Sequence, residues 1–438
     1  MNELQATPTI EGVTSAFNRE AVEARAESEP AWLRERRLAA WAVYESTPLP
    51  TTRSEQWRYT DPKMLLWDRV ETAPSPESMP AEARSLLSGK DAAGTVLQYG
   101  TSLLESSLDA ALRAKGVILT DLATAAIEHR ELVKEYLGTR ALLPDAGKFA
   151  ALNAALWSGG VFLYVPRGVR LERPIRVVRY IDRPGAYQPR TLIVTADGSH
   201  VGLVEEFVSP DFDQPVFCNG AVEVHAGPAS KVHYVALQQW GLGVRHLSTQ
   251  RTVAQRDASL DTLVVNLGAT VARVDLAASL DGPGARSDML GLYFGRADQH
   301  FDHQTRQDHR VPHASSDLLY KGALADQSSA IFRGLIKVWP KAQRTDAYQT
   351  NRNLLLSRQA QATSLPNLEI EADDVRCSHA ATVGHLDAEE LFYIMSRGIP
   401  RAQAERLVVF GFLGEVLDRV PMPEVGRELR GAIAKRIG

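Results

Sequence analysis

From about Gly159 to Cys377 the chain consists of short apolar and β-branched runs separated by small or polar residues. The segments 191–195 and 263–267 are two such runs, and both are rich in Val, Leu and Thr. Runs of this kind, bounded by turn residues, are typical of β-strands. Because no long stretch with helical spacing interrupts them, we predict that this part of the chain is all-β.

The turns between these runs recur at a nearly constant distance along the sequence. Ala229, Ala258, Ala285 and Ala314 are 29, 27 and 29 residues apart, and a β-rich run follows each of them. A fixed period in an all-β region indicates stacked coils, each of which buries its apolar face only when a neighbour covers it. We therefore predict a right-handed parallel β-helix. A β-sandwich in which the spacing is coincidental is the alternative.

Helical spacing dominates the sequence on both sides of this region. The first 45 residues predict a helix, with Ser28 as its N-cap and Pro30 in its first turn. Leu104, Leu108 and Leu112 predict a further helix. After Asp387 apolar residues again recur at helical spacing.

The pattern as a whole predicts a mixed α and β fold in three parts. We expect an N-terminal helical and mixed domain over 1–145, a β-helix core over 146–385 and a C-terminal helical domain over 386–438.

Composition and charge narrow the kinds of partner. The 438 residues carry a formal net charge of -4, which provides no overall basic field for nucleic acid or an anionic membrane. The N-terminus lacks an export signal, and no run of about 18 apolar residues occurs. Cys218 and Cys377 are the only cysteines and form no C-x-x-C pair. We expect a cytoplasmic protein whose partners are proteins or small ligands.

The sequence has no phosphate-binding loop of the G-x-x-x-x-G-K-[ST] type. Gly147-Lys148 lacks the upstream glycine and the following Ser or Thr, and Gly241-Leu242-Gly243 lacks the third glycine of a dinucleotide turn. If ATP drives the work of this protein, another subunit must hydrolyse it.

Two groups of residues are candidate metal ligands. The first comprises His300, His303, His309 and His313. In a strand, His300 and His303 face opposite sides, so a polar, solvated strand and turn is the competing interpretation. The second is Cys377-Ser378-His379, in which Cys377 and His379 share a face of a strand and could present a thiolate beside an imidazole. A buried structural cysteine is the alternative there.

Carboxylates also recur near the predicted turns, as in the β-helix enzymes that cleave glycans. Turn chemistry explains Asp at these positions equally well. They are Asp257, Asp261, Asp281 and Asp288.

Several longer strings identify a family. They include Trp57-Arg58-Tyr59-Thr60, Lys148-Phe149 through Asn153, Tyr164-Val165-Pro166-Arg167-Gly168-Val169, Asn353-Leu354-Leu355-Leu356-Ser357, Pro366-Asn367-Leu368-Glu369-Ile370, Cys377-Ser378-His379-Ala380-Ala381-Thr382-Val383-Gly384 and Ser396-Arg397-Gly398-Ile399. In order and spacing the chain resembles the SufB/SufD family of iron–sulfur cluster assembly proteins, and within it the SufD type. One departure is Ala380, where the family usually has Gly.

The resemblance implies a non-enzymatic scaffold subunit that supports cluster assembly and iron acquisition. It implies a SufB-like paralogue, paired through the last β-helix strands, and a SufC-like ABC-type ATPase docked on the C-terminal helical domain. For the chain alone, a homodimer formed through the same strands is one possibility, and the sequence does not decide it. No tightly bound cofactor is expected in the lone chain, only a transient iron–sulfur cluster within the complex and ATP on the partner ATPase. A SufB-type paralogue and a stand-alone β-helix metalloprotein are the alternatives.

The resemblance also implies site residues. His379 matches the residue at the interface where a nascent cluster forms, and Cys377 accompanies it as a second transient ligand. ATP binding is expected to twist the paired β-helices and expose this region. The residues expected to contact the ATPase are Leu391, Phe392, Tyr393, Arg397, Gly398 and Phe410.

Overall fold

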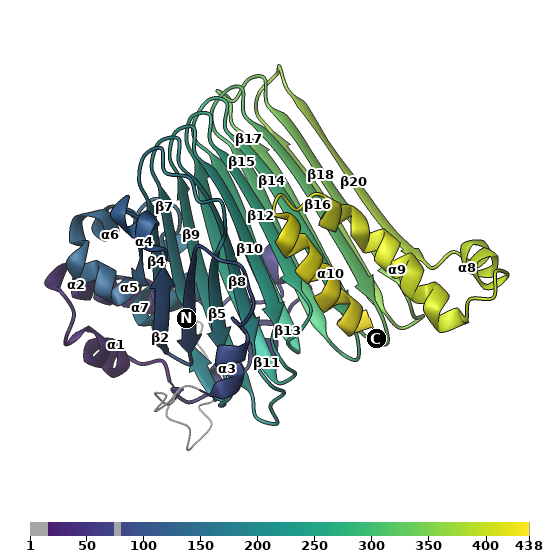
Figure 1. Cartoon of the computed structure of the whole chain (residues 1–438), viewed down its shortest axis with the longest axis horizontal. Coiled ribbons are helices and arrows are strands. Elements are labelled where there is room, and N and C mark those ends of the chain that lie inside the picture. Colours follow the sequence, from purple (N-terminus) through teal and green to yellow (C-terminus); the bar gives the residue numbers. More distant parts are fainter. Residues whose placement is uncertain (1–15, 74–79, 438) are drawn as a thin grey trace, which may run out of the picture.

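The computed structural model describes residues 16–73 and 80–437, and in it the chain forms a parallel β-helix with helices packed on its outside (Figure 1). Two sheets face each other across the core. Sheet I comprises, in spatial order, β2 (Ser102–Leu108), β1 (Gly94–Tyr99), β5 (Ile175–Tyr180), β8 (His200–Val208), β10 (Lys231–Gln239), β12 (Ser259–Asn266), β14 (Arg286–Gly295), β16 (Ser315–Leu324), β18 (Asp346–Leu355) and β20 (Arg376–His385).

Sheet II contains the strands that alternate with these along the chain. In spatial order they are β19 (Gln361–Ile370), β17 (Ser329–Val338), β15 (His300–His309), β13 (Val271–Leu280), β11 (Val244–Ala254), β9 (Val216–Ala226), β7 (Arg190–Thr195), β4 (Gly160–Val165) and β3 (Ile118–Asp121), with β6 (Gly185–Tyr187) paired to β9. The alternation of successive strands between two parallel sheets confirms the predicted β-helix and excludes the β-sandwich.

The repeat that predicted the coils corresponds to a buried column at one corner of the helix. Ser259, Arg286 and Ser315 begin successive strands of sheet I and lie in register. The residues just before them are therefore aligned, and Ala258, Ala285 and Ala314 are all buried there. Ala229 lies one position outside this column, at a positive φ of 54°, and the buried Ser230 takes its place.

Aromatic rings and glycines alternate between neighbouring coils inside the helix. Tyr293 of β14 lies opposite Gly322 of β16, and Gly291 lies opposite Tyr320. A Cβ atom on either glycine would collide with the facing tyrosine ring. The rings are accommodated only because the neighbouring coil has no side chain at that level.

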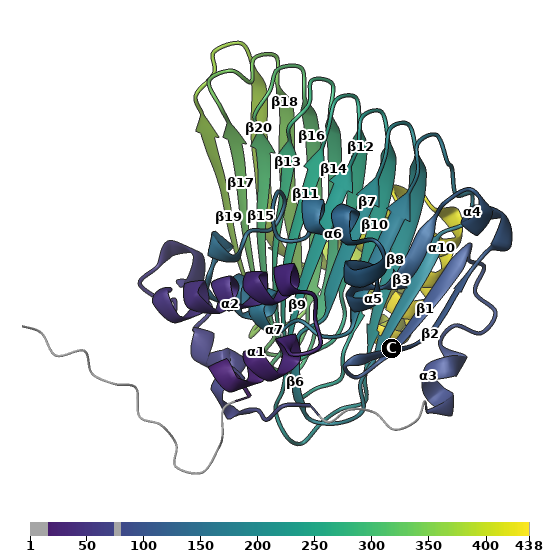
Figure 2. The ribbon, with the colours of Figure 1, turned by 90° about the vertical axis from the view of Figure 1, so that its left-hand side faces the viewer.

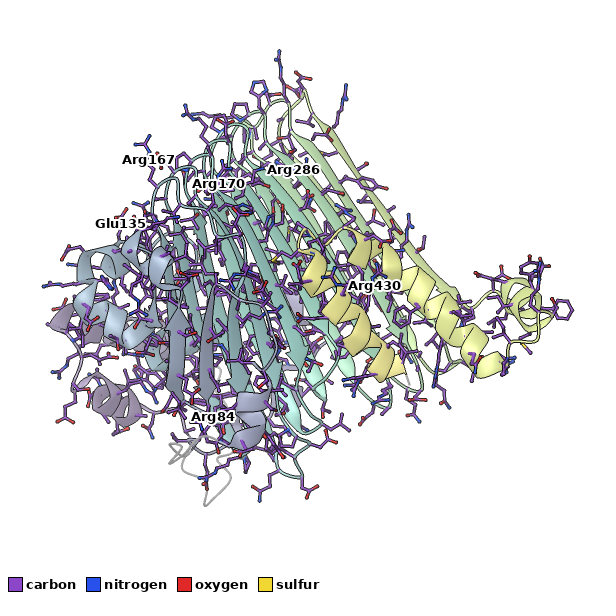
Figure 3. The ribbon with its side chains drawn as sticks, in the orientation of Figure 1. Arg84, Glu135, Arg167, Arg170, Arg286 and Arg430 are labelled. Carbon is purple, nitrogen blue, oxygen red and sulfur yellow. The ribbon has the colours of Figure 1, made fainter. Side chains whose placement is uncertain are left out.

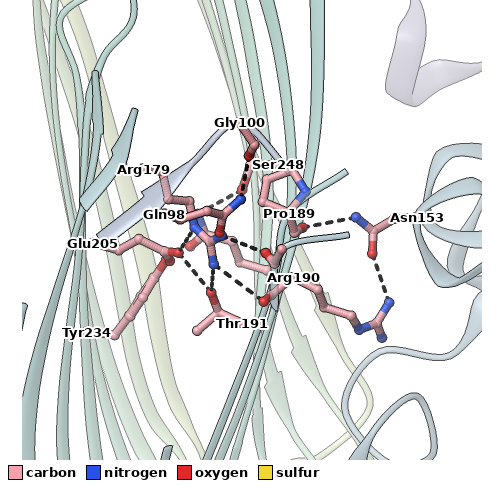
Figure 4. A network of polar contacts seen from close by, with 12 residues as sticks. Gln98, Gly100, Asn153, Arg179, Pro189, Arg190, Thr191, Glu205, Tyr234 and Ser248 are labelled. Atoms are coloured by element: carbon pink, nitrogen blue, oxygen red, sulfur yellow. Dashed lines mark hydrogen bonds and ion pairs between the residues drawn. The ribbon is translucent and has the colours of Figure 1, made fainter. Parts of the chain in front are cut away.

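The early coils bury a charged network instead (Figure 4). The Arg179 guanidinium pairs with the Glu205 carboxylate and donates a 2.8 Å hydrogen bond to Thr191. The Tyr234 hydroxyl donates to the same carboxylate over 2.6 Å. Buried charges are tolerated when they are paired and hydrogen-bonded in this way.

The helices cover the outside of the two sheets. Figure 2 shows the N-terminal helices α1, α2 and α7 against the part of sheet II that contains β9. Figure 1 shows α9 and α10 lying across sheet I, with α8 projecting beyond it. They are α1 (Arg19–Ala26), α2 (Ala31–Ser46), α3 (Ala81–Ser85), α4 (Ala110–Ala114), α5 (Leu122–Glu128), α6 (Arg130–Tyr136), α7 (Lys148–Leu156), α8 (Ala388–Met395), α9 (Arg401–Asp418) and α10 (Pro423–Ile437).

Two predictions for the N-terminal part were wrong. The helix predicted over the first 45 residues is divided: α2 begins at Ala31 with Pro30 as its N-cap, so Ser28 does not cap it. Residues 1–15 of that predicted helix lie outside the described residues. Leu104 and Leu108 belong to β2, which pairs antiparallel with β1, so tertiary pairing overrides their helical spacing.

The two ends of the β-helix differ. At the first end, β2 and β3 run antiparallel to their neighbours and close the two sheets. At the other end, β19 and β20 are the last strands of their sheets. Each of them therefore leaves one row of backbone N–H and C=O groups without a neighbouring strand in the described chain.

Candidate functional site

The candidate ligands Cys377 and His379 lie on β20, the last strand of sheet I. They are in register with Ala347 and Gln349 of β18, which are buried inside the β-helix. Cys377 and His379 consequently share the inward face of the last coil. Ala380 directly follows His379, at the position where the family usually has Gly. Its φ is not positive, so its Cβ imposes no backbone strain there.

The two side chains have different surroundings. Cys377 is half-buried and, like Leu368 and Val375, packs against a small apolar cluster that includes Ala347. Burial, and secondly the Asp346 carboxylate, raise the pKa of its thiol. His379 is exposed, and no described residue forms a hydrogen bond with its ring. In the free chain the site thus offers a protonated thiol beside an accessible imidazole.

Two apolar side chains of the last strands are exposed at the same end of the coil stack. Ile370 of β19 is 40% exposed and Val383 of β20 is 46% exposed, although both occupy inward-facing positions that are covered in earlier coils. Within the described residues, no group of three or more His, Cys, Asp or Glu side chains could hold a metal ion. Cys377 and His379 would therefore need donors from a second chain to complete a metal coordination shell.

The four histidines of the earlier candidate site do not converge. His300 faces outward and shares a 2.9 Å hydrogen bond with Thr60, whose hydroxyl also donates to Asp302 over 2.6 Å. His303 faces inward, stacks on the Tyr293 ring with centroids 4.5 Å apart and contacts the Asn266 amide at 2.8 Å. The opposite orientation of His300 and His303 agrees with the strand alternation.

The interpretation of this stretch as a solvated strand was wrong. His300, His303 and His309 are all buried, and only His313 is exposed, in a turn with a φ of 62°. Burial lowers the pKa of His303 and of His309 to about 4. These rings are therefore neutral hydrogen-bonding groups in the packed core. The contact between Thr60 and His300 joins residues 240 positions apart, which no local pattern could reveal.

The carboxylates near the turns are also dispersed. Asp261 pairs with His233 at 2.9 Å, Asp281 lies 3.6 Å from Arg310, and Asp288 pairs with Arg286 at 3.0 Å. Figure 3 shows Arg286 at the edge of the coil stack. Asp257 occupies a turn with a φ of 58°. Each group has its own local role, and the set forms no paired-carboxylate site of the kind that glycan cleavage requires.

The residues expected to contact an ATPase divide into two groups. Phe392 and Tyr393 are 73% and 60% exposed on α8, which lies apart from the sheets (Figure 1). Arg397 is exposed and donates a 2.6 Å hydrogen bond to the Tyr393 hydroxyl. Leu391 is buried, Phe410 packs partly against the core between α9 and sheet I, and Gly398 has a φ of 83° that ends the helical segment.

Comparison with known proteins identifies the family. A model of the "SUF system FeS cluster assembly, SufBD core domain" matches residues 179–412, and a model of the "SufBD protein N-terminal region" matches residues 14–177. The chain belongs to the SufBD family of the SUF system. It is a subunit of SUF-type iron–sulfur cluster assembly.

Relatives resemble this SufBD chain over nearly its whole length. The iron–sulfur cluster assembly protein SufD of Bacillus subtilis is 34% identical over 418 residues, which cover 93% of this chain and 95% of that protein. A SufBD family protein of Staphylococcus haemolyticus is 28% identical over 423 residues, with 94% and 90% covered. Among the described helices of this SufBD chain, none is long and apolar enough to cross a membrane.

The surroundings of the two cysteines predict different thiol reactivity. Burial raises the pKa of Cys218 to about 12, while Cys377 is half-buried with a smaller rise. Because the thiolate is the reactive form, we expect a disulfide reagent at pH 8 to modify one thiol per native chain, more slowly than a free cysteine and faster as the pH rises. Unfolding the chain in denaturant should expose the second thiol, that of Cys218, to the reagent. Cys377→Ser should abolish the native reaction, and two fast thiols in the native chain would contradict the assignment.

Proposed function

We propose that this SufBD chain is a SufD-type scaffold subunit that acts in the cytoplasm and performs no catalysis of its own. Its similarity to the SufD protein of Bacillus subtilis supports this type, and the uncovered last coil carries the argument for a scaffold. A repeat structure normally ends in a cap that covers its apolar interior. Here one end has such a cap, whereas the other presents apolar side chains, two strand edges, a thiol and an imidazole.

The partner proposed for this end is a SufB-like paralogue whose own last coil has the same form. Two such ends placed together would continue the sheets across the interface and cover Ile370 and Val383. A buried strand edge is stable only when its backbone groups are paired, and a related coil supplies both that pairing and the matching apolar surface. When the paralogue is absent, a second copy of this chain could occupy the same surface.

The cluster being assembled is the cargo of this interface. Cys377 and His379 supply soft and borderline donors that suit iron, and the paralogue would supply the others. In the free chain the raised pKa of Cys377 keeps its thiol protonated. A change at the interface that moves Cys377 away from the apolar cluster around Ala347 would favour the thiolate and open the site to iron and sulfur. No cofactor need be held tightly by the lone chain.

The ATPase is proposed to dock on α8. Phe392 and Tyr393 are large aromatic side chains exposed on a short projecting helix, and such residues often dominate the binding energy of an interface. A SufC-like ABC-type ATPase would supply the phosphate-binding loop that this sequence lacks. Its movements would reach the last coil through α9, whose Glu415 forms ion pairs with Lys321 of β16 and Arg352 of β18.

Pairing through the last coil predicts that a charge placed there prevents it. Val383→Asp should weaken association with the SufB-like subunit at least about tenfold, because the carboxylate would be buried without a partner. The measurement is co-purification followed by size analysis, with and without the paralogue. Ile127→Asp, on the exposed surface of α5, is the matched control. Equal pairing by Val383→Asp and the unchanged chain would exclude this interface.

Docking on α8 predicts the opposite pattern of binding. Phe392→Ala should weaken binding of the SufC-like ATPase at least about tenfold and leave pairing with the paralogue intact. ATPase turnover should lose its dependence on this chain. Leu104→Ala, which also truncates an exposed apolar side chain, should change neither property. If Phe392→Ala binds the ATPase normally, docking occurs elsewhere.

A ligand role for His379 predicts that His379→Ala lowers the yield of cluster in the reconstituted complex while the complex still assembles. The exposed His313 provides the control as His313→Asn, because Asn tolerates the left-handed backbone of that turn. Cluster yield is measured from the iron and sulfide that the complex retains. An unchanged yield with His379→Ala would show that His379 is not a ligand.

A further inference from the structure

A cavity of about 490 Å³ lies between the outer face of sheet II and the N-terminal segments. Its walls are Leu247, Thr249, Arg273 and Asp275 of β11 and β13, the first turn of α7, and the connection 47–57. The volume is within the range of about 300–1,000 Å³ found for small-molecule sites. The cavity involves neither the last coil nor the C-terminal helices, so the scaffold function does not account for it.

The first turn of α7 faces this cavity with uncapped backbone N–H groups. Gly147 is the N-cap, its φ of 151° favours glycine, and no side chain caps the helix. Lys148, Phe149 and Ala150 follow it and line the cavity. No hydrogen-bond acceptor for their N–H groups occurs among the described residues. Free N–H groups and the helix dipole make such a terminus favourable for an anion.

Lys148 adds a positive charge that has no ionic partner within the described chain. Its ammonium donates a 2.6 Å hydrogen bond to the backbone oxygen of Tyr44 and lies 4.0 Å from the centroid of the Tyr44 ring. Neither contact neutralises it. Burial lowers the pKa of Lys148, and the opposing effect of the Glu45 carboxylate does not offset this shift.

Thr249 provides a donor that is independent of α7 and has no partner in the described chain. Its side chain is on the outward face of β11 beside Leu247, lines the cavity, and the residue is only 7% exposed. No hydrogen bond joins its hydroxyl to any described residue. The hydroxyl is therefore available to donate a hydrogen bond to a molecule in the cavity.

The other charged groups of the cavity are already paired. Arg273 pairs with Asp302 and stacks over the Trp57 ring, with its guanidinium carbon 3.9 Å from the ring centroid. Asp275 accepts two 2.9 Å hydrogen bonds from Arg251, which also lower its pKa. The unpaired donors are therefore on the side of α7 and Thr249, while Trp57 and Pro48 supply apolar surface.

We propose that this cavity binds a phosphate monoester, with its phosphate at the first turn of α7 and its organic group against Trp57 and Pro48. The phosphate oxygens accept hydrogen bonds from the free N–H groups, the Lys148 ammonium and the Thr249 hydroxyl. A tetrahedral dianion fits donors that approach from the helix, a lysine and a strand better than a planar carboxylate does.

The test is calorimetric titration of the full chain with three probes: phenyl phosphate, adenosine monophosphate and inorganic phosphate. We expect at least one of the two esters to bind more tightly than inorganic phosphate. Lys148→Gln should weaken ester binding about tenfold or more, and Thr249→Val several-fold, because each removes a donor to the dianion. Lys148→Arg should retain most of the affinity. The control Lys341→Gln removes an exposed lysine and should change nothing.

Comparison of the two esters shows whether the organic group is a nucleoside or a simple aromatic ring. Thermal unfolding of each variant establishes that it folds. The proposal is overturned if neither ester binds at about 1 mM, if inorganic phosphate binds as tightly as both, or if a folded Lys148→Gln chain binds the esters as the unchanged chain does.

Discussion

A coil of a β-helix cannot bury its interior by itself, and the structure of this protein depends on that constraint. Every inward side chain between β5 and β18 is covered by the coils before and after it. The two ends of the stack need another solution. At the first end the chain provides one with antiparallel strands, and at the last end it provides none among the residues described.

The same constraint gives the two cysteines different chemistry. Cys218 is inside the stack, where burial raises the pKa of its thiol to about 12 and leaves it inert. Cys377 occupies an inward position as well, but in the last coil, so it is only half-buried. Position in the stack, and not the neighbouring sequence alone, determines which of the two thiols is accessible.

Local patterns predicted much of the fold. Strand alternation and the spacing of Ala258, Ala285 and Ala314 are properties of neighbouring residues, and they were sufficient to identify the β-helix. The same reasoning placed Cys377 and His379 on one face. It failed for Leu104 and Leu108, because pairing of β2 with β1 decides their structure and helical spacing does not. It also failed to predict that three of the four histidines are buried.

Long-range contacts explain those failures. Thr60 reaches His300 across 240 positions, and only the folded coils bring the first turn of α7 close to Thr249. Amphipathic spacing in the C-terminal part indicated helices correctly, but it could not separate the buried Leu391 from its exposed neighbours Phe392 and Tyr393. That separation depends on which side of α8 packs against the rest of the chain.

The attachment of the C-terminal helices bears on how an ATPase could influence the last coil. The buried ammonium of Lys321 on β16 pairs with Glu415 of α9, and Arg352 on β18 lies 3.4 Å from the same carboxylate. β18 is hydrogen-bonded along its whole length to β20, which carries Cys377 and His379. A displacement of α9 therefore acts on the strand next to the candidate site. On the proposed function, a movement of the docked ATPase would pass from α9 to β16 and β18, and from β18 to the last coil.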